Sequence, residues 1–301
     1  MDENWISDAR QRLLALRQPS GGWGYRKRTS PAIEPTSLAA LSLLNTDREV
    51  SRAAGDWLVS IRNRDGSLGI SRDLTKPCWP TPHACLLWAA LDEHQVERSA
   101  AIEWLLRTKG TQIPRVERSP IGHDTQLVGW PWIEGTHSWV EPTAMALLVL
   151  ARKGMRQHPR ALEGLRVLRD RAIPTGGWNI GNPRAFGTPL RAHPSQTGLA
   201  LLALAEAGWA HEPTVAPAIS FLKKALAETL APASLSWGIL GLRAWETAPP
   251  RADEWLAKAY DRISDRTEDA TALALLLLAA GERSLDHLGI IPRESWCCDE
   301  V

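Results

Sequence analysis

The stretch EPTAMALLVLA, residues 141–151, decides the fold of this 301-residue chain. After Thr143 it contains no charged side chain, so a helix formed here is apolar on every face. A helix of this kind has to be buried on all sides. Five further segments share the nearly all-apolar pattern, and they lie at 36–44, 84–91, 197–208, 234–242 and 271–281. The sequence therefore predicts six buried helices.

A second kind of segment precedes each buried one. It contains the short pattern Ala-x-x-bulky-Leu, or a close variant, beginning at Ala9, Ala54, Ala101, Ala161, Ala218 and Ala252. Charged residues fall on one side of these segments, as in SRAAGDWLVSIRN at 51–63, which is typical of a helix with one solvent-exposed face. Each buried helix is therefore expected to pair with a half-exposed helix that comes before it.

Six alternations of this kind, about 35 to 60 residues apart, predict one all-α architecture built from repeats. We predict an (α/α)6 toroid, in which six outer and six inner helices form a closed double ring. An open helical solenoid has the same alternation, but it needs polar capping repeats at its ends. The sixth buried segment, 271–281, is the most apolar, which favours closure. No linker-like stretch interrupts the chain, so we expect one domain at 1–285 and a tail at 286–301.

Composition and charge argue against several classes of function. Lys and Arg number 35 against 34 Asp and Glu, a net charge of +1, which argues against a nucleic-acid or anionic-membrane binder. The longest apolar run is far shorter than the roughly 20 residues of a membrane-spanning helix, which leaves only peripheral membrane contact. The acidic, polar start indicates no signal peptide and the four cysteines make no disulfide framework, so we expect a cytoplasmic protein.

Glycine-rich loops join the predicted outer and inner helices at 19–28, 63–72, 128–135 and 174–184. The chain has 15 Trp against 2 Tyr and 2 Phe, and a Trp often follows Gly in these loops, where it can fill the gap between helical pairs. Most of the tryptophans are therefore predicted to be packing residues. Two connections, 108–128 and 179–193, exceed typical lengths, which indicates a functional lid or insertion.

The most specific motifs are GGWG at 21–24, GGWN at 176–179 and the helix starts EPTSLAALSLL, EPTAMALLVL and SQTGLALLAL. They resemble the prenyltransferase and squalene-oxidase repeat of protein prenyltransferase β subunits and class II terpene cyclases. The resemblance covers nearly the whole chain. It implies a barrel of helical pairs with a central apolar cavity for an isoprenoid or another hydrophobic small molecule. A repeat of this kind identifies a fold rather than a reaction.

The terpene cyclases use a DxDD motif at the start of an inner helix to protonate an alkene or epoxide. The corresponding stretch here, 139–144, keeps only one acidic residue, Glu141, and the sixth repeat, 267–272, keeps only Asp269. DxDD is absent from the chain. The resemblance therefore implies a noncanonical cyclase in which Glu141 is the acid or the cation-stabilising base, with Asp269 as the second candidate.

Further residues have candidate roles beside Glu141. His137 precedes it by four residues and is a candidate proton relay, and Glu34 begins the first inner helix in the same way as Glu141 begins the third. The alternative is that Glu34 and Glu141 merely start helices, where the helix dipole favours a carboxylate. Tryptophan rings can stabilise a cationic intermediate. The three candidates for this role are Trp132, Trp139 and Trp178.

Basic residues in the same loops suggest a substrate with a diphosphate group, because Arg makes bidentate phosphate contacts. The candidates are Arg26, Arg184 and Arg191, with His83 and His193 also placed near the substrate. The alternative is that these are ordinary surface charges.

The second candidate function is a zinc-dependent prenyltransferase-like enzyme. Its Asp-x-Cys ligand pair is missing, and any zinc site would have to be assembled from residues such as His83, Cys85, His123 and Asp124. We therefore expect no metal or other cofactor. The third candidate is a non-catalytic toroid that binds an isoprenoid or acts as a scaffold. The sequence leaves the oligomeric state open.

Overall fold

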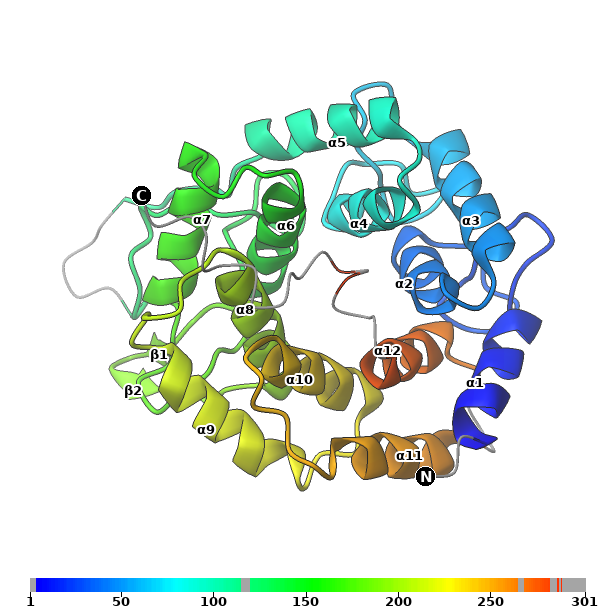
Figure 1. Ribbon diagram of the computed structural model, residues 1–301. Helices are drawn as coiled ribbons and strands as arrows, with labels where there is room; N and C mark the ends of the chain where they lie inside the picture. Colours follow the sequence, from blue (N-terminus) through cyan, green and yellow to red (C-terminus); the bar gives the residue numbers. More distant parts are fainter. Residues whose placement is uncertain (1–3, 115–119, 265–267, 282–285, 287, 289–301) are drawn as a thin grey trace, which may run out of the picture. The chain divides into compact units, whose positions relative to one another are not determined.

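The computed structural model describes residues 4–114, 120–264, 268–281, 286 and 288 (Figure 1). These residues form twelve α helices and one small hairpin of the strands β1 (Arg184–Ala185) and β2 (Thr188–Pro189). The all-α prediction is confirmed, whereas the predicted tail at 286–301 falls almost entirely outside the described residues. No helix among the described residues has the length and apolarity to cross a membrane.

The odd-numbered helices correspond to the predicted half-exposed segments. They are α1 (Asn4–Ala15), α3 (Arg48–Ile61), α5 (Gln95–Arg107), α7 (Pro159–Asp170), α9 (Val215–Leu226) and α11 (Ala252–Ser264). Helix α9 illustrates the pattern, because its buried residues Val215, Ala218, Leu222 and Leu226 recur every three or four positions. Residues at this spacing lie on one face of a helix, so each odd-numbered helix buries one side and exposes the other.

The even-numbered helices correspond to the predicted buried segments. They are α2 (Ile33–Leu43), α4 (Thr81–Leu91), α6 (Val140–Arg152), α8 (Pro194–Glu206), α10 (Pro232–Ala244) and α12 (Ala270–Ala280). Every residue at 142–151 in α6 and at 197–206 in α8 is buried. Each fully buried Leu contributes about 1.5–3 kcal/mol of transfer free energy, so these helices form the core.

The chain divides into two compact units. Unit 1 comprises residues 1–108, 229–236 and 250–287, and unit 2 comprises 109–228, 237–249 and 288–301, so the boundary falls within α10. In unit 1, helix α12 packs against α1, α2 and α11, and α2 also packs against α3 and α4 (Figure 1). In unit 2, helix α6 packs against α7 and α8, and α8 packs against α9. Because the last helix contacts the first two, the chain closes on itself.

A threonine in each of four even-numbered helices holds the loop that precedes it. Its hydroxyl accepts a backbone N–H from the loop, in the pairs Trp23 to Thr36 (2.9 Å), Leu68 to Thr81 (3.0 Å), Trp130 to Thr143 (3.0 Å) and Trp178 to Thr197 (2.9 Å). All four loop side chains are buried. The prediction that the loop tryptophans serve packing is confirmed for these three.

A backbone hydrogen bond links three of the repeats to the repeat that follows. The first residue of the buried helix donates its N–H to the loop of the following repeat, from Ile33 to Ile70 O (2.9 Å), from Val140 to Ile180 O (2.9 Å) and from Ala270 to Tyr25 O (3.2 Å). The first two bonds join repeats that follow one another in sequence. The third joins the last repeat to the first in the same way, which confirms closure and excludes an open solenoid.

Candidate functional site

The first candidate site lies at the start of α2 in unit 1. Glu34, in the first helical turn, is half-buried, and its Oε2 accepts a hydrogen bond from the Tyr25 hydroxyl at 2.7 Å. Burial raises the pKa of Glu34 to about 7; the Tyr25 hydrogen bond opposes the rise and the negative charge of Asp269 adds to it. At neutral pH a substantial fraction of Glu34 is therefore protonated and able to donate a proton.

The contact between the loop of the first repeat and the start of α12, which closes the chain, places Tyr25 and Asp269 beside Glu34. Arg26 and Asp269 form an antiparallel bridge, flanked by the bond from Ala270 N to Tyr25 O and by one of 3.0 Å from Lys27 N to Glu268 O. Lys27 Nζ also lies 3.1 Å from Glu268 Oε1. The loop from the first repeat and the start of α12 are thus held together through backbone and side-chain contacts.

Close contacts around residue 24 explain why the GGWG motif ends in glycine. A Cβ atom at this position would lie 2.3 Å from Thr29 Oγ1 and 2.4 Å from the Thr29 carbonyl oxygen. These distances are far below any van der Waals contact, so only glycine allows the turn that carries Tyr25 to the acid.

Asp269 has a structural role as well as an electrostatic one. Its Oδ1 accepts the Ala272 N–H at 3.0 Å, which makes it the N-cap of α12. Glu34 has no such role, because the N-cap position of α2 is Ala32 and no side chain caps that helix. The alternative that Glu34 serves only to start a helix therefore lacks a capping bond to support it.

Glu141 occupies the equivalent position at the start of α6 in unit 2. It is half-buried, and its Oε2 accepts a hydrogen bond from Gln196 Nε2 at 3.2 Å. His137, predicted as its proton relay, is exposed, and its Nδ1 lies 3.3 Å from the carbonyl oxygen of Thr111. The structure thus places His137 on the wall of a separate cavity.

This second candidate site is a cavity of about 170 Å³ in unit 2. The two long connections predicted from the sequence as a lid or insertion contribute to it and contact each other, through the bridge between Ile121 and Ala185 and the bond from Gly122 N to Arg184 O at 3.2 Å. Its lining includes Ile121, His123, His137, Trp139, Arg171 and Asn182. Of the three tryptophans predicted to face a substrate, Trp139 is the one that lines this cavity.

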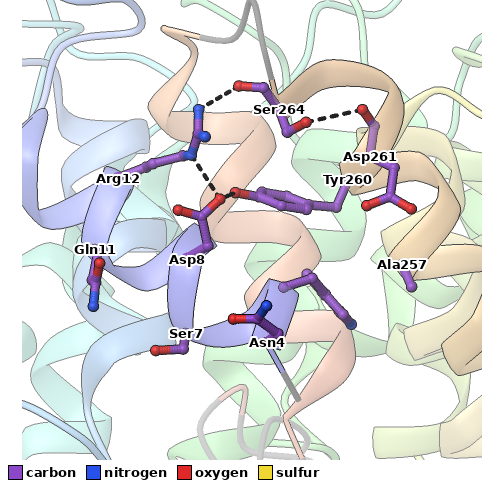
Figure 2. Close-up of a pocket in the computed structure, with 10 residues that line it drawn as sticks. Asn4, Ser7, Asp8, Gln11, Arg12, Ala257, Tyr260, Asp261 and Ser264 are labelled. Carbon is purple, nitrogen blue, oxygen red and sulfur yellow. Dashed lines mark hydrogen bonds and ion pairs between the residues drawn. The ribbon is translucent and has the colours of Figure 1, made fainter. Parts of the chain in front are cut away.

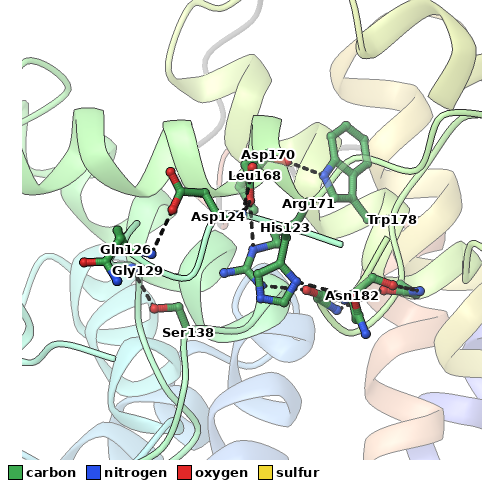
Figure 3. A network of polar contacts seen from close by, with 12 residues as sticks. His123, Asp124, Gln126, Gly129, Ser138, Leu168, Asp170, Arg171, Trp178 and Asn182 are labelled. Carbon is green, nitrogen blue, oxygen red and sulfur yellow. Dashed lines mark hydrogen bonds and ion pairs between the residues drawn. The ribbon is translucent and has the colours of Figure 1, made fainter. Parts of the chain in front are cut away.

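Figure 3 shows the polar network on one side of this cavity. Arg171 is 3% exposed, donates from Nη1 to Gly181 O at 2.9 Å and places Nε 3.3 Å from Asp170 Oδ2. Burial lowers the pKa of Arg171 to about 10 and, together with the Arg171 charge, lowers that of His123 to about 4. His123 is therefore neutral at pH 7, with Nδ1 3.4 Å from Asn182 Oδ1. The cavity offers a neutral imidazole and a guanidinium whose charge Asp170 balances.

A third hollow, of about 560 Å³, lies between α1 and α11 (Figure 2). Tyr260 donates a hydrogen bond to the Asp8 carboxylate, which also lies 2.9 Å from Arg12 Nε. The Tyr260 hydrogen bond lowers the pKa of Asp8, and burial raises that of Tyr260. The polar groups of this network satisfy one another, so it ties the first and last half-exposed helices together instead of presenting a reactive group.

Two predicted substrate residues are buried in the core. Trp178 is 0% exposed and donates its indole N–H to Leu168 O at 2.6 Å, so neither ring face is available to a ligand. His83 is 2% exposed, and burial lowers its pKa to about 4, so it is a neutral core residue. Both residues were predicted to contact a substrate, and in this structure neighbouring side chains cover them.

The remaining predicted residues lie nearer to solvent. Trp132 is half-buried, and the exposed residues are Arg26, Arg184, Arg191 and His193. Arg26 adjoins the acid site through its bridge with Asp269, Arg184 lies in β1, and His193 holds the N-cap position of α8. Arg26 belongs to unit 1, and Arg184 and Arg191 belong to unit 2.

The predicted zinc ligands belong to both units. His83 and Cys85 are buried in unit 1, and His123 and Asp124 lie in unit 2. Among the described residues, no group of three or more His, Cys, Asp or Glu side chains could hold a metal ion.

The sequence analysis missed Tyr25. Its signal was faint: the chain has only 2 Tyr, and this one stands two residues after the loop Trp, where the second and fourth loops have Ile. The third loop has Trp132 there, so Tyr25 is the one hydroxyl at this position, and a half-buried Tyr hydroxyl usually has a hydrogen-bond partner.

No protein-family model and no curated protein sequence matches this chain. Solved structures match over almost its whole length. The type II terpene cyclase MstE from Scytonema matches with a TM-score of 0.60 at 15% identity, covering 96% of this chain and 98% of that chain. An α-amylase from Clostridium perfringens matches with a TM-score of 0.62 at 13% identity, covering 93% and 98%. A family 76 mannosidase from Bacteroides thetaiotaomicron matches with a TM-score of 0.54 at 10% identity, covering 95% and 99%.

These likenesses establish the fold. The chain has the (α/α)6 toroid fold that a terpene cyclase shares with glycoside hydrolases, as the sequence predicted. The cyclase, the amylase and the mannosidase are all enzymes, but identities of 10 to 15% do not carry a specific activity from one chain to another.

Proposed function

We propose that this protein is a terpene cyclase-like enzyme that starts the reaction of an isoprenoid by protonating it, with Glu34 as the acid. The observation that carries the proposal is the group formed by Tyr25, Glu34 and Asp269, in which a half-buried carboxyl group has a pKa of about 7. A catalytic acid works best when its pKa lies near the operating pH, because a large fraction is then protonated and the group is still acidic enough to transfer its proton. Glu34 thereby replaces the missing DxDD acid.

Each member of the group has a distinct part in this chemistry. Tyr25 donates to Oε2 of Glu34, which leaves Oε1 to carry the transferable proton. Burial is the main cause that keeps the proton on Glu34 at neutral pH, and the negative charge of Asp269 adds to this effect. Once the proton has left, the Tyr25 hydroxyl stabilises the Glu34 carboxylate. Tyr25 and Asp269 are therefore positioning residues.

The proposed step balances without a co-reactant. The O–H bond of Glu34 breaks and a C–H bond forms at one alkene carbon, which leaves a cation at the other carbon. Ring closure moves this cation along the chain. Transfer of a proton from carbon back to the Glu34 carboxylate, through solvent, gives a neutral product and restores the acid. The overall reaction is an isomerisation. A variant of the cyclase MstE has been solved with geranylgeranyl dihydroxybenzoate, so a toroid of this fold accommodates an isoprenoid chain.

Arg26 is the best placed of the three predicted arginines to bind a diphosphate group on such a substrate. It is exposed, and it adjoins Asp269 on the bridged segment beside the acid. Arg184 and Arg191 belong to unit 2, whereas the acid belongs to unit 1.

Glycoside hydrolysis is the second candidate function. Glycosidases use two carboxyl groups, of which the acid has a raised pKa, and Glu34 with Asp269 meets this description. The likeness to an amylase and a mannosidase supports the same reaction class. The repeat motifs of the sequence favour the cyclase.

A substrate panel in D₂O distinguishes the candidates. Purified protein is incubated with squalene, farnesyl diphosphate, geranylgeranyl diphosphate, an α-glucan and an α-mannan, and products are followed by mass spectrometry and reducing-sugar assay. The proposal expects a cyclised isoprenoid with one solvent deuterium at the protonated carbon. Release of reducing sugar without isoprenoid turnover would establish the glycosidase, and binding of an isoprenoid without turnover would indicate the non-catalytic alternative.

A further inference from the structure

The hairpin of β1 and β2 carries an aromatic side chain at its tip. Arg184 pairs with Pro189 and Ala185 with Thr188, so Phe186 and Gly187 form the turn. The Phe186 side chain is 85% exposed, more than any other large apolar residue among those described. A phenyl ring in this position buries almost nothing and contributes nothing to the core.

The backbone of the turn makes this choice of residue more unusual. Phe186 has a φ of 50° and Gly187 a φ of 79°, so both lie in the left-handed region. Two-residue turns of this geometry favour Asn, Asp or Gly, and a bulky residue with positive φ is an outlier. Local structure therefore disfavours Phe186. Strained positions of this kind concentrate at functional sites.

The hairpin is held firmly at its base. Gly122 N donates to Arg184 O at 3.2 Å, Phe186 N donates to Pro120 O at 3.0 Å and Leu190 N donates to Pro183 O at 2.9 Å. A Cβ atom at Gly122 would lie 2.4 Å from Arg184 Cβ, so the two loops approach as closely as a glycine permits. The tip is thus presented by a braced support.

The surroundings of the tip are apolar and cationic. Ile180 and Leu190 of the same loop are 46% and 37% exposed. Arg184 and Arg191 are exposed, and neither forms an ion pair with another described residue. The sequence has no Asp or Glu from 171 to 205 and has three Arg, of which Arg171 is buried beside Asp170. Arg184 and Arg191 are therefore the exposed cations that this loop offers to a ligand.

We propose that this hairpin, with Phe186 at its tip and Arg184, Leu190 and Arg191 in or directly beside its strands, docks the protein on a membrane that contains anionic lipid. An exposed aromatic ring favours the boundary between head groups and acyl chains, and arginines beside it attract anionic head groups. The combination of an apolar tip with adjacent cations fits a lipid surface, whereas apolar exposure alone would fit a protein equally well. One hairpin gives a weak and reversible attachment. The inference does not depend on the acid at Glu34.

Vesicle co-sedimentation tests the proposal with the full chain. The protein is mixed with vesicles of phosphatidylcholine alone or of phosphatidylcholine with phosphatidylglycerol. We expect binding to the anionic vesicles, weaker binding to the neutral ones and a decline as salt increases. Phe186→Asn should lower the partition coefficient about tenfold, because the ring no longer enters the interface. Arg184→Gln and Arg191→Gln should each lower it about fivefold on anionic vesicles only.

The design separates lost docking from lost folding. Asn adopts positive φ readily, so Phe186→Asn should keep or raise the melting temperature. Val96→Asn is the matched control: Val96 is 77% exposed on α5 in unit 1, and its replacement should leave vesicle binding unchanged. Equal vesicle binding by the wild type and Phe186→Asn would overturn the proposal. The proposal would also be overturned if the wild type bound neither kind of vesicle and instead formed a dimer that the Phe186→Asn substitution dissociates.

Discussion

The starts of α2 in unit 1 and α6 in unit 2 have the same backbone frame and different chemistry. Both read apolar-Glu-Pro-Thr, at 33–36 and 140–143. In both, the threonine hydroxyl accepts the backbone N–H of a buried loop Trp, and the first helical N–H donates to the loop of a neighbouring repeat. Glu34 then receives a phenol hydroxyl from Tyr25, whereas Glu141 receives an amide from Gln196.

The difference shows that the repeat fixes where the carboxyl group lies, while residues from neighbouring segments fix what it can do. Asp269, whose charge helps to raise the pKa of Glu34, belongs to the last repeat. It is brought beside residue 34 only because the chain closes. Closure of the chain therefore adds Asp269 to a carboxyl group whose pKa is raised mainly by burial. The start of α6 is instead linked to Ile180 of the next repeat in sequence.

The largest expected effect is on turnover, in the pair Glu34→Gln and Glu141→Gln. Loss of a general acid costs about 10²–10⁴-fold in rate, so Glu34→Gln should lower kcat by that factor on whichever isoprenoid the panel identifies. Glu141→Gln keeps a hydrogen-bonding group beside Gln196 and should change kcat less than about threefold, within the range of a single neutral hydrogen bond.

Circular dichroism of both variants checks that the fold is intact. The opposite ranking, with Glu141→Gln inactive and Glu34→Gln active, would move the acid to unit 2 and end the comparison as drawn. Equal activity of all three proteins would remove both carboxyl groups from the chemistry.

The second largest effect is on the free energy of unfolding as a function of pH. Glu34 has a pKa of about 7 in the folded protein against an ordinary value of 4.5. Its contribution is fully present below pH 4.5 and is lost as pH rises to 7, because the unfolded chain ionises first. The loss amounts to at most about 3 kcal/mol. Glu34→Gln should abolish it and be more stable than the wild type at pH 8.

Urea unfolding of the two proteins at pH 4.5 and pH 8 measures this difference. Subtracting the Glu34→Gln curve from that of the wild type cancels the other titrating groups, His123 among them. If the two curves remain parallel across this range, Glu34 ionises normally and cannot be the acid.

The fold was predictable because burial repeats. Six segments have charged residues on one side and six are nearly all apolar, and the apolar character of 271–281 indicated a helix with neighbours on all sides, which α12 has. The acid site was only half predictable. Glu34 and Asp269 stand at helix starts visible in the sequence, but their proximity is a contact across more than 230 positions, for which no local pattern exists.

Burial also determines where two of the predicted substrate residues, Trp178 and His83, lie in the structure. Trp178 follows two glycines in a loop, a position where a ring can be exposed. The same motif brings its backbone N–H to the Thr197 hydroxyl, and the ring is buried in the core. His83 precedes an apolar helix as a ligand would, yet it is 2% exposed. Residue type and spacing indicate which chemistry a side chain offers, but not whether the side chain is buried in the core or exposed to a ligand.

The third prediction tests the part that the two regions have in common. Thr36→Val removes the acceptor of the buried backbone N–H of Trp23, and Thr143→Val removes that of Trp130. Such a loss costs about 1–3 kcal/mol, and the shared frame predicts similar values in the two units. Thr247→Val is the control, because this half-buried hydroxyl only donates, at 3.3 Å to Leu242 O. A large cost in one unit alone would show that the frames differ.

The smallest effect concerns Tyr25, the residue that most distinguishes the two regions. Tyr25→Phe removes the hydrogen bond that opposes the rise in pKa, so the pKa of Glu34 should increase above about 7. Below pH 7, where both proteins hold the proton, the variant should be slower by up to about tenfold, because the carboxylate formed on proton transfer loses its donor. At higher pH the variant keeps its acid protonated for longer, so the ratio of variant to wild-type rate should rise with pH. Tyr260→Phe, which changes the other tyrosine that donates to a carboxylate, is the matched control and should leave the pH profile of turnover unchanged even if it loosens α1 from α11. A ratio independent of pH would mean that Tyr25 only packs beside Glu34, and the chemical difference between the two helix starts would then rest on Asp269 alone.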